Sequence, residues 1–79
     1  MARPRLTLDP ESGAAYIFLT EPRADLVTTS VALWPVDDQP DALRWLVLDF
    51  DADGRLVGIK VLEPRQALRS ETLTESSEA

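Results

Sequence analysis

The residues of this sequence that could do chemistry are mainly aspartates, and three of them stand at alternate positions. The string DFDADG runs from Asp49 to Gly54 and includes Asp51 and Asp53. An EF-hand calcium loop takes side-chain oxygens at its first, third and fifth positions, a glycine at its sixth and a bidentate glutamate at its twelfth. Counted from Asp49, the twelfth position is Lys60, a cation where the ion most needs carboxylate oxygens. We therefore keep a divalent-cation site, most simply for calcium, as an alternative prediction. The three aspartates would be its ligands.

The same string also fits the turn of a β-hairpin. A type I turn favours aspartate at its first position and, in this hairpin type, a left-handed glycine at its fourth, and Asp51 and Gly54 supply both. This turn places Asp51 opposite Arg55 as a pair of opposite charges. The register that follows pairs Phe50 with Leu56, Asp49 with Val57, Leu48 with Gly58, Val47 with Ile59, Leu46 with Lys60 and Trp45 with Val61. We predict that the string is chiefly a hairpin turn.

Few side chains are suited to catalysis. The chain has no histidine and no cysteine, so the usual ligands of zinc, haem and iron–sulfur clusters are missing. Its serines have no evident base in a nucleophile motif. We therefore expect no catalytic residue, no cofactor and no enzymatic activity, with a carboxylate pair drawn from Asp9, Glu11 and Asp49 as the remaining route to a small hydrolase.

The charge and hydropathy of the sequence argue against some classes of binding partner. Eight basic residues stand against fourteen acidic ones, a net charge of −6, and such a surface repels phosphate backbones. No apolar run reaches the roughly 18 residues of a membrane span, and the first residues lack a signal-peptide core. We expect no nucleic-acid or membrane partner and a cytoplasmic location. The preference for arginine over lysine, together with many alanines, indicates a bacterial protein.

The remaining elements follow from strand composition and turn formers. We predict five strands, at residues 6–8, 14–20, 26–34, 43–50 and 55–62, and a C-terminal helix of about two turns over residues 64–70. The connections are too short for crossover helices, so the sheet should be antiparallel. The predicted fold is α+β, a single small domain over residues 1–69 followed by an acidic, disordered tail over residues 70–79.

The predicted hairpin has two apolar faces, which one short helix cannot cover. One face carries Trp45, Val47, Ile59 and Val61 together with Val57, and the other carries five further apolar residues, Leu46, Leu48, Phe50, Leu56 and Leu62. A second sheet layer, most simply another copy of the chain, would cover what remains exposed. We therefore predict a homodimer whose interface contains Trp45, Val47, Ile59 and Val61. A sheet that curls on itself is the alternative.

Two segments of the chain together resemble a known family. The segments are LDPESGAAYIFLT and LVLDFDADGRLVGIKVLEPRQAL, and they resemble the small bacterial family called domain of unknown function 2283. The matching positions are Asp9, Tyr16, Ile17, Asp49, Asp51, Asp53, Gly54, Val57, Gly58, Ile59 and Leu62. The sequence departs from the family pattern at Gly13, Ala15 and Lys60 and in the loop PVDDQPD.

The resemblance implies a compact β-rich fold without an assigned activity. Relatives encoded beside small toxin-like proteins would imply an antitoxin-like role. In such a role an acidic protein neutralises the product of a neighbouring gene. Together with the residues, this leads us to expect a non-enzymatic protein-interaction module that acts as a homodimer and has a cognate protein partner.

Overall fold

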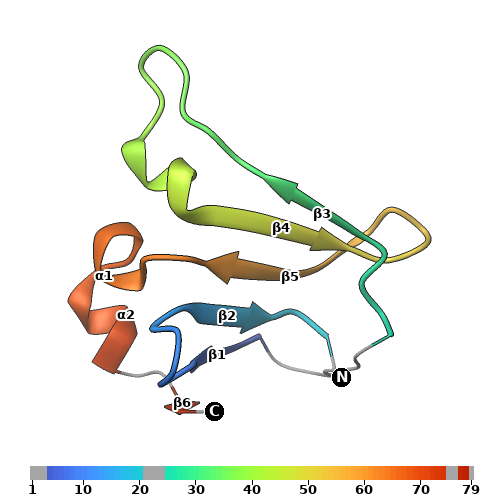
Figure 1. Cartoon of the computed structure of the whole chain (residues 1–79), viewed down its shortest axis with the longest axis horizontal. Helices are drawn as coiled ribbons and strands as arrows, with labels where there is room; N and C mark the ends of the chain where they lie inside the picture. Colours follow the sequence, from blue (N-terminus) through green and yellow to red (C-terminus); the bar gives the residue numbers. More distant parts are fainter. Residues whose placement is uncertain (1–3, 21–24, 75–76, 79) are drawn as a thin grey trace.

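The computed structural model describes residues 4–20, 25–74 and 77–78, and its main element is a sheet of five antiparallel strands (Figure 1). The strands are β1 (Arg5–Leu8), β2 (Ala15–Phe18), β3 (Thr29–Ala32), β4 (Leu46–Phe50) and β5 (Leu56–Val61). Their order across the sheet is β3-β4-β5-β2-β1, and the two-residue β6 (Ser77–Glu78) pairs in parallel with β1. The predicted α+β class and five-stranded antiparallel sheet are confirmed, and the parallel β6 is an addition to them.

Helical structure is split into three short pieces at one end of the sheet (Figure 1). They are the 3-10 helix η1 (Asp41–Trp45) and the helices α1 (Pro64–Ala67) and α2 (Ser70–Thr74). The single two-turn helix predicted from Pro64 is wrong, because Leu68 takes an extended conformation with φ −119° and ψ 153° and ends α1 after one turn. None of the helices in the described ranges is long and apolar enough to cross a membrane.

Part of the segment predicted as a disordered tail has regular structure. Residues 70–74 form α2, and residues 77–78 form β6. Helix α1 packs against both η1 and α2, and β6 gains its pairing from β1. Tertiary contacts of this kind add to the weak propensity of such short elements, which sequence alone cannot reveal.

The strand predicted to begin at Leu43 begins three residues later, at Leu46. Residues 41–45 form η1 instead, in which the Leu43 N–H donates to the Pro40 carbonyl at 3.2 Å. The carboxylate of Asp41 and the guanidinium of Arg44 lie 3.3 Å apart on this single turn and support it. Trp45 consequently belongs to a helical turn and not to the sheet.

The hairpin turn between β4 and β5 has the predicted structure. The Gly54 N–H donates to the Asp51 carbonyl at 3.0 Å, and Gly54 has a φ of +77°. The Asp51 side chain accepts hydrogen bonds from the N–H groups of Asp53 and Arg55, each at 3.0 Å. Asp51 therefore lies opposite Arg55 as predicted, but its carboxylate binds the backbone of the turn.

The predicted register is correct at Phe50 and Leu56 and wrong beyond that pair. A β-bulge leaves Val57 as an extra residue on β5, so that Asp49 pairs with Gly58. Every later pair is shifted by one residue, namely Leu48 with Ile59, Val47 with Lys60 and Leu46 with Val61. A bulge of this kind leaves the composition of both strands unchanged, which is why the strand pattern did not indicate it.

Alternation along the paired strands then defines one apolar and one polar face of the sheet. The apolar face contains a row of five aliphatic residues in register across the strands, which we call the middle row: Leu6, Ile17, Ile59, Leu48 and Val31. The opposite face, which we call the polar face, contains the polar or charged residues Arg5, Thr7, Ser30, Asp49 and Lys60 together with Tyr16, Phe18, Ala32, Val47 and Gly58. The chain is thus amphipathic across its sheet, contrary to the expectation of two apolar faces.

The buried core is small and reaches both ends of β5, with Val57 beside the hairpin turn and Val61 beside the helices. Among the described residues the buried hydrophobic side chains are Ala15, Val57 and Val61, and Pro64 at the start of α1 is also buried. Ala15 and Val61 pair directly across β2 and β5 and extend the apolar face on the side of the helices. This is a small core, and it leaves the centre of the apolar face outside it.

We predict that Gly54→Ala destabilises the protein by about 1 kcal/mol, because a side chain at positive φ is strained. Urea denaturation followed by circular dichroism measures the change in the free energy of unfolding. Gly54→Asn is the matched control, since asparagine tolerates the left-handed conformation and should recover most of the loss. Equal losses in both variants would contradict this account of the turn.

Candidate functional site

The best-defined polar cluster is centred on Asp49, in the middle of the polar face. Asp49 lies on β4 and is only 6% exposed. Its carboxylate accepts a hydrogen bond from the Tyr16 hydroxyl at 2.5 Å and another from the Ser30 hydroxyl at 2.7 Å. A buried carboxylate is costly unless such donors reach it, so the two hydroxyls offset its loss of hydration. The cluster joins β2, β3 and β4 through one side chain.

Gly58 makes the contact between Tyr16 and Asp49 geometrically possible. Strand β5 lies between β2 and β4, and the Tyr16 side chain has to pass over it to reach Asp49. A Cβ atom on Gly58 would lie less than 3.0 Å from the hydroxyl oxygen and two ring carbons of Tyr16. The absent side chain of Gly58 is therefore the space that the tyrosine ring occupies.

In this cluster the Tyr16 hydroxyl is a hydrogen-bond donor and the Asp49 carboxylate is its acceptor. Burial raises the pKa of the Tyr16 hydroxyl well above its usual value of 10.0, and the hydrogen bond and negative charge of Asp49 raise it further. Tyr16 is thus held as a proton donor and is unsuited to act as a base near neutral pH. Its ring also contacts Phe18, with centroids 4.7 Å apart. The arrangement stabilises the sheet and offers no activated nucleophile.

The three aspartates proposed as a cation site do not converge. Asp49 is committed to two hydroxyls on the polar face, whereas the Asp51 side chain binds N–H groups within the hairpin turn. Asp53 is exposed in that turn. Within the described ranges no group of three or more histidine, cysteine, aspartate or glutamate side chains is arranged to hold a metal ion. Cation binding stays a prediction without geometric support.

The four residues predicted to form the interface do not share a surface. Trp45 belongs to η1, and Val61 is fully buried. Val47 pairs with Lys60 on the polar face, while Ile59 pairs with Leu48 on the apolar face. The bulge at Val57 explains why Val47 and Ile59 lie on opposite faces, because a shift of one residue moves a strand's side chains to the opposite face.

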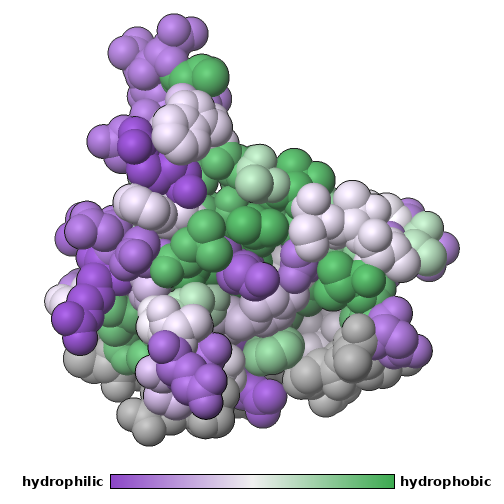
Figure 2. All heavy atoms as spheres, viewed as in Figure 1, coloured by the Kyte–Doolittle hydropathy of each residue, from purple (hydrophilic) through white to green (hydrophobic). Residues whose placement is uncertain are grey.

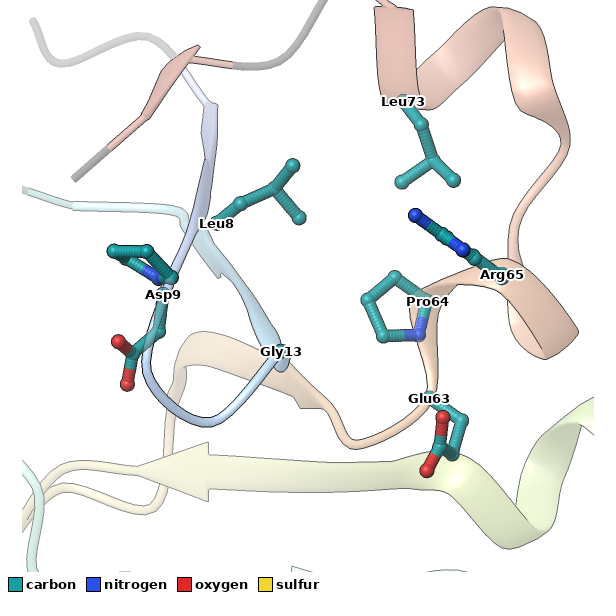
Figure 3. Close-up of a pocket in the computed structure, with 8 residues that line it drawn as sticks. Leu8, Asp9, Gly13, Glu63, Pro64, Arg65 and Leu73 are labelled. Atoms are coloured by element: carbon teal, nitrogen blue, oxygen red, sulfur yellow. The ribbon is translucent and has the colours of Figure 1, made fainter.

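A cavity of about 410 Å³ lies where the turn between β1 and β2 meets the start of α1 (Figure 3). Leu8 and Leu73 face each other across it, whereas the carboxylates of Asp9 and Glu63 point away from them (Figure 3). Asp9 accepts hydrogen bonds from the Glu11 N–H and the Ser12 hydroxyl, each at 3.0 Å, and these lower its pKa. The cavity therefore presents no pair of facing carboxylates for acid–base catalysis.

Sequence reasoning missed a cluster of exposed apolar residues around β3. Six large hydrophobic residues are notably exposed in the described part of the chain, and four of them lie within residues 27–36: Val27 at 38%, Val31 at 43%, Trp34 at 66% and Val36 at 57%. The uncharged run of residues 26–34 was the available signal. It indicated a strand, but only the sheet order shows that β3 is an edge strand.

Trp34 is held in place although most of it is exposed. The Arg44 guanidinium lies over its ring, 4.8 Å from the centroid, and Arg44 is in turn paired with Asp41. Cation–π contacts of this kind contribute about 0.5–1 kcal/mol at exposed sites. The indole is thus oriented by η1 and presented to solvent at the end of β3.

Comparisons with known proteins identify one family. A family model described as "Protein of unknown function (DUF2283)" matches residues 5–63, which include all five antiparallel strands. No curated protein and no solved structure matches the chain significantly.

We predict that Gly58→Ala costs about 1–3 kcal/mol of stability, the usual range for overpacking, because the new methyl group displaces the Tyr16 ring. The same substitution in a Tyr16→Ala background should cost much less, since the colliding ring is gone. Chemical denaturation of the four proteins of this double-mutant cycle measures the coupling. Additive costs would refute the close approach of Tyr16 to Gly58.

We also predict that stability declines with rising pH above about 10, the usual pKa of tyrosine. The folded state keeps the Tyr16 proton more tightly than the unfolded state, so this contribution is complete below the unfolded pKa and is lost as pH rises toward the folded one. The chain has a single tyrosine, so near-ultraviolet absorbance reports its ionisation directly. Asp49→Asn should lower the pKa of Tyr16, and an unchanged titration would contradict the assigned cause.

Proposed function

This chain belongs to the family described as protein of unknown function DUF2283, and on that premise we propose that it is a non-enzymatic protein-interaction module that acts as a homodimer. The observation that carries this proposal is the open middle row of the apolar face. Of its members, Leu6, Ile17, Ile59 and Leu48 are half-buried and Val31 is exposed. Ile59 lies on the central strand β5 and Leu48 on the neighbouring strand β4, where a covered sheet would bury them.

The architecture leaves this row without a cover. Stable domains place a second layer against the apolar face of a sheet. Here the three helical pieces gather at one end of the sheet, and α1 packs against η1 and α2 (Figure 1). The cover therefore has to come from outside the described chain.

Surface area supports the same reading. A compact monomer of 8.8 kDa is expected to expose about 4,800 Å². The chain exposes 5995 Å², an excess of about 1,200 Å², whereas a standard interface buries about 800 Å² on each partner. The excess belongs to the whole chain, including the extended segment at residues 33–40, and is comparable in size to one side of such an interface.

A second copy of the chain is the simplest cover. The middle row has no charged residue, so two such rows can meet around a two-fold axis without burying like charges. Two sheets packed in this way form a sandwich with a core about 10 Å thick. The net charge of −6 then remains on the solvated surfaces and supports solubility.

The non-enzymatic part of the proposal is supported by the use of the polar groups. Tyr16, Ser30 and Asp49 satisfy one another, and the carboxylate of Asp9 supports its own turn. In this proposal the dimer serves another protein, as in an antitoxin-like role toward the product of a neighbouring gene. The acidic surface favours a basic protein in that position.

We predict that light scattering at micromolar concentrations gives the mass of a dimer, and that Ile59→Lys converts it to a folded monomer. A lysine at this half-buried position can extend its charged end to water in the monomer but would bury its charge in the dimer. Val47→Lys is the matched control, because Val47 lies on the adjacent strand but on the polar face. A monomeric parent protein, or equal dissociation by both variants, would overturn the proposed dimer.

A further inference from the structure

Strand β3 forms an open edge of the sheet (Figure 1). The Leu33 N–H donates to the Leu46 carbonyl at 3.1 Å, which marks these residues as a hydrogen-bonded pair with β4. Hydrogen-bonded pairs alternate along an antiparallel ladder, so the backbone groups of Val31 face β4 and those of Ser30 and Ala32 face outward. The edge thus presents the N–H and C=O groups of two residues to a further strand.

This edge lacks the features with which proteins usually protect such strands. Exposed edges commonly carry a charge, a proline or a bulge that prevents pairing with another chain. Residues 26–34 contain no charged residue and no proline, and residues 29–32 pair with β4 without a register shift. Val31 and Trp34 add exposed apolar surface at the same place. An unprotected edge of this composition is typical of a site that receives a strand.

The edge is also held in a conformation ready for pairing. The Ser30 hydroxyl donates to the buried Asp49 carboxylate at 2.7 Å, and the Thr28 N–H donates to the Phe50 carbonyl at 2.9 Å. These bonds fix β3 against β4 from within the sheet. A strand that pairs with β3 therefore meets a preformed partner and avoids the entropic cost of ordering it.

Charge at the two ends of β3 decides which kind of strand fits. Beyond β3 the chain projects as an arm, residues 33–40, whose polar tip stands away from the rest of the molecule (Figure 2). Asp37 and Asp38 lie exposed on this arm, and Asp25 precedes the other end of β3. Antiparallel pairing of two β3 strands would bring the arm of each copy toward Asp25 of the other. Like charges would then meet, which disfavours a second copy at this edge.

We propose that the β3 edge binds an extended segment of another protein, apolar along its length and basic where it meets the arm. This inference rests on the proposed interaction function and names the partner's chemistry. The segment adds a strand to the sheet through the outward backbone groups of Ser30 and Ala32. Val31 and Trp34 contact its apolar side chains, and Asp37 and Asp38 pair with its lysines or arginines.

The test uses two synthetic peptides. Each contains a run of five residues in which valine and threonine alternate. One peptide ends in two lysines and the other in two glutamates. We expect the lysine peptide to bind about tenfold or more tightly than the glutamate peptide, with an affinity that falls as salt is added. Amide hydrogen exchange should slow at Ser30 and Ala32 when it binds, because these N–H groups gain partners.

Two variants keep the result specific to the edge. Ala32→Pro removes an outward N–H without removing a bond to β4 and should abolish binding, whereas Ala32→Ser keeps that N–H and should bind as the parent does. Melting temperatures confirm that both variants are folded. Binding of neither peptide, equal binding of both, or protection outside β3 would overturn the edge site.

Light scattering separates this inference from the proposed dimer. A dimer that fails to bind the lysine peptide overturns the edge site alone. A parent protein that is monomeric but binds the peptide at β3 overturns the dimer and supports the edge. Loss of the dimer in Ala32→Pro, with the dimer retained in Ile59→Lys, would assign the β3 edge to a second copy and overturn the basic partner.

Discussion

The extra residue at Val57 is the constraint from which most of this structure follows. It shifts β5 by one position against β4, so that Asp49 faces Gly58 and Leu48 faces Ile59. With this register the carboxylate of Asp49 lies on the same face as the space above Gly58, and Tyr16 can reach it. Without the bulge the polar residue would have faced Val57, and both faces would have been mixed.

The Asp49 cluster links the centre of the sheet to its edge strand β3. One carboxylate receives a hydroxyl from β2 and another from β3, so three strands are linked by hydrogen bonds of a charged group. Such bonds are stronger than those between neutral groups, and burial makes each of them costly to lose. The edge strand β3 is therefore attached to the centre of the sheet both by its ladder and by a side chain.

The two faces and the edge then divide the surface by chemistry. The apolar face is uncharged and open along its middle row, which suits a matching apolar face. The β3 edge offers backbone groups and lies beside acidic residues, which suits an extended basic segment. Because the face and the edge point in different directions, a sandwich dimer leaves the edge available for a partner. In the proposed function, such a small domain would gain stability from the second copy and specificity from the partner segment.

The sequence by itself determined the five strands, the antiparallel sheet and the turn at Asp51 and Gly54. These features could be predicted because strand composition and turn geometry depend on neighbouring residues. The sequence also indicated the absence of histidine and cysteine chemistry. The tertiary structure decided the face of each residue, and so separated Val47 from Ile59 and placed Tyr16 over Gly58. A one-residue bulge reverses the faces without altering any local preference, and contacts across the sheet alone select it.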